Sequence, residues 1–91
     1  MNIYYIPPQV VKSPKSRLQG KITVLRDGGP YDWSLAKFKW DGKESLGIRW
    51  NGGDEDNGLG NPQSRGLPTW FILPEEVEQL FIKYLEKENK K

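Results

Sequence analysis

A chain of 91 residues suits one domain with a modest core, and this one contains neither cysteine nor histidine. These absences exclude disulfides, thiolate metal sites, cysteine nucleophiles and the commonest general base, and we expect no cofactor, no metal ion and no enzymatic activity. The net charge is +2, and the four Trp, four Tyr and three Phe predict a folded chain rather than a disordered one. No apolar run reaches the length of a membrane span and no signal-peptide pattern is present, so we expect a cytoplasmic protein without a membrane partner.

The N-terminal part is predicted to form two strands separated by a basic loop. Residues 2–6 ("NIYYI") are β-branched and aromatic, which is typical of a strand, and Pro7-Pro8 ends it. Residues 12–19 are polar, basic and broken by proline, and they predict a loop. Residues 20–27 predict the second strand, with Ile22 and Val24 on one face.

The segment "WSLAKFKWDGKESLGIRW", residues 33–50, predicts a β-hairpin that turns at Asp41-Gly42. Its register depends on the loop length, because side chains alternate between faces along a strand. If the loop has two residues, Trp33 pairs with Trp50 and Lys39 with Glu44, and each face is half apolar.

A loop with an odd number of residues places a different set of side chains on each face of the hairpin. The apolar side chains then share one face and the charged ones gather on the other. We favour the odd loop, because burial of the apolar set is worth several kcal/mol and one cross-strand ion pair only about 0.2–1 kcal/mol. The two-residue loop remains the alternative, and it would suit a sheet covered on both sides.

The remainder of the chain predicts a long loop, a strand and a helix. Residues 51–68 are rich in glycine and form a loop long enough to be either functional or disordered. Residues 69–73 predict a strand, residues 74–88 a helix that starts at Pro74, and residues 89–91 a frayed tail. Five apolar residues recur at helical spacing and predict one buried stripe: Val77, Leu80, Phe81, Tyr84 and Leu85.

These elements predict a single domain over residues 1–91 of the α+β class, mainly β. About five short, mostly antiparallel strands form a small barrel of the SH3-like type or a curved sheet, and the C-terminal helix caps it. The helix needs the sheet as a platform, since the entropy lost in ordering it is as large as the gain from burying its stripe, or larger.

The charges are unevenly distributed, with seven basic and two acidic side chains among the first forty residues and seven basic and ten acidic among the rest. With an odd hairpin loop, Lys37, Lys39 and Arg49 share a face with Trp33, and Lys21 joins them. Such a face attracts a polyanion, and an exposed tryptophan beside it stacks a base. The pattern thus predicts a nucleic-acid-binding face. The alternative is a solvated face with Trp33 half buried at its edge.

A second candidate site lies at Gln63, Ser64 and Arg65, between two prolines. A rigid loop there would present Arg65 to an anion or to a partner protein. The alternative is an ion pair between Arg65 and the acidic residues of its own loop. Residues 54–56 are all acidic, but the glutamate that closes a calcium loop is missing, so we expect a solvated loop there.

Two blocks, "WSLAKFKWDGKESLGIRWNGG" and "PQSRGLPTWFILPEEV", resemble a family of small uncharacterised bacterial proteins over residues 20–80. The resemblance implies that both blocks belong to one domain, and it implies no activity. "KFKWDGKE", with a tryptophan before a C-terminal helix, is also similar to the chromodomain layout of a curved three-stranded sheet plus helix. The long loop after Trp50 departs from that layout and no aromatic cage can be assigned, so methyl-lysine recognition is not carried over.

The sequence leads to two functional hypotheses. The first is a non-enzymatic β-domain that binds nucleic acid through the basic face. The alternative is a protein-interaction or regulatory module that uses residues 51–68 and exposed aromatic side chains. We expect a monomer, or a weak homodimer formed through an open sheet edge.

Overall fold

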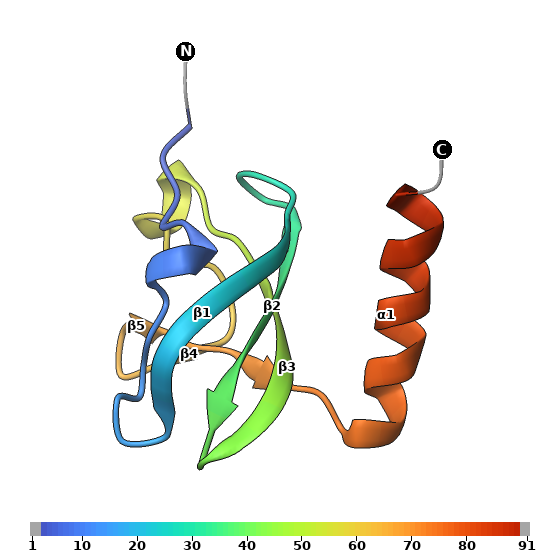
Figure 1. The fold of residues 1–91 in the computed structure, drawn as a ribbon. Coiled ribbons are helices and arrows are strands. Elements are labelled where there is room, and N and C mark those ends of the chain that lie inside the picture. The colour runs from blue at the N-terminus through green and yellow to red at the C-terminus, as the bar shows by residue number, and fades with distance from the viewer. Residues whose placement is uncertain (1–2, 90–91) are drawn as a thin grey trace.

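The computed structural model describes residues 3–89, which form an antiparallel sheet with a helix standing beside it (Figure 1). The strands of the main sheet lie in the order β1-β2-β3-β6, and a separate small hairpin is made of β4 and β5. The elements in chain order are η1 (Pro8–Val10), β1 (Leu18–Asp27), β2 (Trp33–Trp40), β3 (Lys43–Trp50), η2 (Asp54–Asp56), β4 (Gln63–Ser64), β5 (Leu67–Pro68), β6 (Phe71–Ile72) and α1 (Glu75–Asn89).

The predicted fold class is confirmed in its coarse form: a mainly β domain with antiparallel strands and a C-terminal helix. The sheet is not a closed barrel, because β1 and β6 lie at its two ends and do not pair with each other. Strand β6 has only two residues, and it pairs with β3 without closing the sheet.

Four predicted elements differ from the structure. Residue 2 lies outside the described residues, and residues 3–6, predicted as a strand, pair with the 51–60 loop instead of a strand: the Ile6 N–H donates to the Gly58 carbonyl at 3.0 Å. The predicted strand 69–73 shrinks to Phe71–Ile72, while β1 begins at Leu18, inside the predicted loop 12–19. Asn89, predicted as tail, is the last helical residue, and residues 90–91 lie outside the described residues.

The hairpin β2–β3 has the two-residue loop, so the favoured odd loop is wrong. Asp41 and Gly42 both have positive φ, 53° and 81°, which is the geometry of a type I′ turn. Trp33 pairs with Trp50 and Lys39 with Glu44. The argument for the odd loop assumed that one face must carry the apolar side chains, whereas both faces of this sheet are covered.

One face of the sheet, here called the core face, holds the larger buried cluster. The N-terminal segment and the residue before β6 cover it, and the Trp70 indole N–H donates to the Val11 carbonyl at 2.8 Å. Phe38 lies 5.3 Å from Trp70 between ring centroids. The members are Val11, Leu18, Ile22, Ala36, Phe38 and Trp70.

The opposite face, here called the helix face, carries α1. Leu35, Leu46 and Leu73 form its buried centre, and one side of the helix packs on them. The predicted stripe is only partly buried, since Leu80 and Tyr84 are 65% and 41% exposed. Ile82 replaces them in the contact, together with Val77, Phe81 and Leu85. Among residues 3–89, no helix combines the length and the apolar character that a membrane span requires.

Candidate functional site

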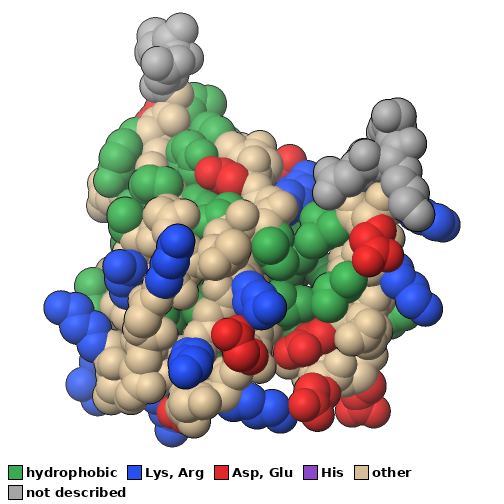
Figure 2. All heavy atoms as spheres, viewed as in Figure 1, with side chains coloured by type: hydrophobic (Ala, Val, Ile, Leu, Met, Phe, Trp, Pro, Cys, Tyr) green, Lys and Arg blue, Asp and Glu red, His purple; other side chains and the backbone are tan. Residues whose placement is uncertain are grey.

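The two-residue loop separates the residues of the predicted basic face. Ser34 pairs with Arg49 on the core face, where Arg49 is 2% exposed, whereas Lys37 and Lys39 are exposed on the helix face. Lys21 is exposed and, by alternation with the buried Ile22, lies on the same side as these two lysines. The predicted group of four cations therefore does not exist, although three lysines remain on one side. Figure 2 shows basic side chains over the sheet and acidic ones at the start of α1.

Trp33, the predicted stacking residue, already has partners within the chain. The Arg26 guanidinium lies 4.0 Å from the centre of its ring. The rings of Phe81 and Tyr84 lie 6.1 and 5.9 Å away, centroid to centroid. Trp33 thus joins α1 to the sheet, and these contacts occupy a ring that would otherwise stack on a base.

Gln63, Ser64 and Arg65 do lie together, on the small hairpin β4–β5. Arg65 and Gly66 form its turn with φ of 53° and 78°, and all three predicted residues are exposed. Gln63 is held by its Nε2, which donates to the Gly60 carbonyl at 2.9 Å. Among the described residues no ion pair joins Arg65 to the acids of its loop, so its guanidinium stands at the tip of a turn.

The glycine-rich segment after β3 is held by one carboxylate. Asp56 accepts hydrogen bonds from the N–H groups of Gly53 and Gly60, at 3.0 and 2.9 Å. These backbone donors lower the pKa of Asp56, with the bond from Gly53 the largest cause. Tyr31 packs so closely on Gly53 that a Cβ there would lie 2.1 Å from the ring. Residues 3–89 contain no group of three acidic side chains placed to hold a metal ion.

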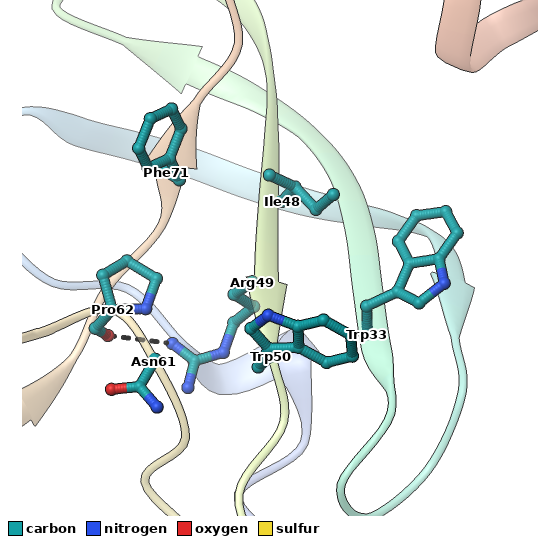
Figure 3. A pocket seen from close by; sticks show the side chains of 7 residues that line it. All are labelled: Trp33, Ile48, Arg49, Trp50, Asn61, Pro62 and Phe71. Atoms are coloured by element: carbon teal, nitrogen blue, oxygen red, sulfur yellow. Dashed lines mark hydrogen bonds between the residues drawn. The ribbon is translucent and has the colours of Figure 1, made fainter.

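An apolar groove of about 500 Å³ lies beside the end of β3 and is here called the aromatic groove (Figure 3). Two of its side chains are unusually exposed: Trp50 is 57% exposed and Phe71 61%. Asn61 is held beside it, since its backbone exchanges two hydrogen bonds with Trp50 at 2.8 and 3.0 Å. The lining residues are Trp33, Ile48, Arg49, Trp50, Asn61, Pro62 and Phe71.

The groove is built by the strand register and was not predicted. Trp33 pairs with Trp50 and Ile48 with Phe71, so these four large side chains emerge on the same side of three neighbouring strands. A smaller hollow of about 250 Å³ shares Trp33 with the groove and continues onto the exposed residues of α1, Leu80 and Tyr84. The alternative register of the hairpin, with its two-residue loop, already placed Trp33, Ile48 and Trp50 on one face. Pro62 and Phe71 come from other segments, and no local sequence pattern connects these segments to the hairpin.

Among the described residues that border the aromatic groove, Arg49 alone is ionisable, and its side chain points to the core face, away from Ile48 and Trp50. Its guanidinium donates to the carbonyls of Leu59, Pro62 and Thr69, and so ties the chain between the end of β3 and β6 to the sheet. Its Nε is buried and has no hydrogen-bond partner in the described part of the chain. Burial lowers the pKa of Arg49 to about 10, opposed by the charge of Asp56, so the side chain stays cationic at neutral pH.

Comparison with known proteins gives no relative: no family model, no curated protein and no solved structure matches the chain. The resemblance of residues 20–80 to a small bacterial family therefore stays an expectation. A mostly apolar groove with one exposed amide at its margin is suited to binding, because it offers large contact area and few polar groups that fix orientation.

Proposed function

We propose that the protein is an interaction module that holds an extended, apolar segment of a partner protein in the aromatic groove. The observation that carries this is the groove itself, in which Trp50 and Phe71 remain more than half exposed beside Ile48 and Pro62. Aromatic-lined grooves are a recurring way to bind proline-rich or apolar peptides, because rigid rings supply contact area at little entropic cost.

The size and polarity of the groove favour a peptide over a small polar molecule. A volume of about 500 Å³ lies within the range of ligand sites and accommodates a few side chains. Asn61 is exposed at its margin, and its amide can donate to and accept from a bound backbone. A bound segment would cover the two exposed rings, which gains about 25 cal/mol for each Å² of apolar surface removed from water.

Selection from a displayed random peptide library on the purified chain tests this proposal. Enriched peptides should be apolar, and Trp50→Ala should weaken their binding at least tenfold, because Trp50 is a large exposed side chain of the groove. Lys37→Ala is the matched control, since Lys37 is exposed on β2 and does not line the groove. Failure to enrich any peptide sensitive to Trp50→Ala would refute the proposal.

A second candidate is weak binding of nucleic acid by the three exposed lysines that share the helix face, Lys21, Lys37 and Lys39. It is supported by their exposure and by the lack of an ion pair to any of them among the described residues. Phosphate contacts by three cations would give an affinity that falls steeply with salt. Binding of single- and double-stranded oligonucleotides at 50 and 200 mM salt, roughly the range over which such contacts are lost, tests it. No binding at the lower salt, or binding unchanged in the triple alanine variant, would rule it out.

A further inference from the structure

We infer that the segment held in the aromatic groove continues over Trp33 onto α1 and seats a second apolar side chain beside Leu80 and Tyr84. This inference rests on the proposed function and specifies the partner: an extended chain with two apolar anchors about four residues apart. It starts from the smaller hollow of about 250 Å³, here called the α1 hollow, which is lined by Trp33, Leu80, Phe81 and Tyr84.

Trp33 forms the boundary between the two hollows, because it lines both of them. Figure 3 shows Trp33 and Phe71 at opposite ends of the aromatic groove. The half-buried ring of Trp33 is held from two sides: Phe81 and Tyr84 lie 6.1 and 5.9 Å away between centroids, and the Arg26 guanidinium lies 4.0 Å from the ring centre. A chain that leaves the groove at this end therefore crosses one fixed side chain and reaches the α1 hollow.

The exposed apolar side chains of the two hollows form a surface of the size that a short segment covers. Trp50 and Phe71 are 57% and 61% exposed in the groove, and Leu80 and Tyr84 are 65% and 41% exposed on α1. With roughly 150–250 Å² for each large side chain, these fractions leave roughly 350–550 Å² of apolar surface in water. A standard interface between folded proteins buries about 800 Å² on each partner, so this surface is too small for a second copy of the chain.

The separation of the two ends of this surface sets the spacing of the anchors. Phe71 on β6 and Trp33 on β2 are two strands apart, and neighbouring strands lie about 4.8 Å from each other. Tyr84 lies a further 5.9 Å from Trp33. The whole path is roughly 15 Å, which about five extended residues span. Alternate side chains of an extended chain face the same way, so the first and fifth can both point into the surface while the third lies over Trp33.

A displayed peptide library with two fixed leucines tests this inference on the intact chain. The second leucine follows the first at every spacing from about two to about eight residues, and all other positions are random. Enrichment should peak at a spacing of about four residues, the value for an extended chain on this surface. A peak near seven residues, the spacing of anchors on a helical partner, or equal enrichment at all spacings would overturn the inference.

Leu80→Ala separates this inference from the proposed function. Leu80 is 65% exposed, so the variant should stay folded, and it should weaken the enriched peptides at least about fivefold. Leu67→Ala is the matched control, because Leu67 is 54% exposed and lines neither hollow. Binding that depends on Trp50 but not on Leu80 would refute the inference and leave the proposed function standing. If no enriched peptide depends on either residue, both fail.

Replacement of one peptide leucine at a time by alanine shows which anchor meets which hollow. A peptide without its α1 anchor should lose its sensitivity to Leu80→Ala and keep its sensitivity to Trp50→Ala, a coupling that a double-mutant cycle measures. Sedimentation equilibrium of the chain alone tests the other occupant, a second copy. The chain should be monomeric at the concentrations used for binding, and a dimer that Leu80→Ala dissociates would overturn the inference.

Discussion

Substitution of Gly47 by alanine tests the register that builds both faces of the sheet. In the structure Gly47 lies under the Phe38 ring on the core face. An added Cβ would come within 2.5 and 2.9 Å of two Phe38 ring carbons and 3.1 Å of the Trp70 Cβ. These distances are well inside van der Waals contact, so the ring or the strand must move.

The expected magnitude follows from two opposing effects. Overpacking of a filled core costs about 1–3 kcal/mol, whereas replacing glycine by alanine inside a strand gains about 0.5–1 kcal/mol of backbone entropy. The 2.5 Å approach puts the overpacking cost in the upper part of that range, about 2–3 kcal/mol, so the net loss should be about 1–2.5 kcal/mol. This lowers the Tm of a domain this size by roughly 5–20 °C. Urea or thermal denaturation followed by circular dichroism measures it.

The alternative register predicts the opposite sign. With an odd hairpin loop, Gly47 would lie on the face away from Phe38, and alanine would be neutral or stabilising. Unchanged or increased stability of Gly47→Ala would therefore refute the register. Phe38→Leu provides the control background, because it removes the ring atoms that the new methyl meets. The cost of Gly47→Ala should fall by at least half in that background, a coupling that a double-mutant cycle isolates.

Three further changes test other parts of the structure. Asp56→Asn should lower the free energy of unfolding at pH 7 and make it depend less on pH in the acid range. The pKa of Asp56 is lowered in the folded state, so its carboxylate contributes fully to stability above the unfolded value of about 3.9. This contribution is lost as the pH falls through the lower pKa of the folded state. Equal pH profiles for both proteins would contradict this. Trp33→Ala should cost roughly 2–4 kcal/mol and speed hydrogen exchange in α1 more than in β1–β3, because it removes the contacts with Phe81 and Tyr84. Uniform exchange changes would argue against that link. Lys43→Ala should cost less than about 1 kcal/mol, because its 2.9 Å ion pair with Glu75 is exposed; a larger loss by urea denaturation would contradict this.

The local patterns of the sequence located most elements correctly. Asp41-Gly42 marked the hairpin turn because both positions accept positive φ, and Pro74 marked the helix start to within one residue. The register failed because the choice between two loop lengths was made as if one face were open to water. Coverage of a face depends on distant segments: Val11 and Trp70 cover the core face, and α1 covers the other.

Local sequence patterns could not predict the candidate site either, because it too is formed by segments that are distant in the chain. Arg49 reads as a surface cation on a strand, and only the correct register turns it into a buried donor for the loop carbonyls. The order of the glycine-rich loop depends on local hydrogen bonds to Asp56, which no sequence pattern marked, and on Tyr31, which packs over Gly53 from a distant part of the chain. The small hairpin at Gln63–Arg65 was anticipated as a rigid loop, but its position next to the groove was not.

We propose that the aromatic groove is the binding surface of this protein. A ¹H–¹⁵N NMR titration of the chain with a selected peptide tests this proposal. The largest shifts should fall on the groove residues, led by the Trp50 indole and Phe71, while the signals of Lys37 and Lys39 stay unchanged. Shifts centred on those lysines, with Trp50 and Phe71 unaffected, would contradict it.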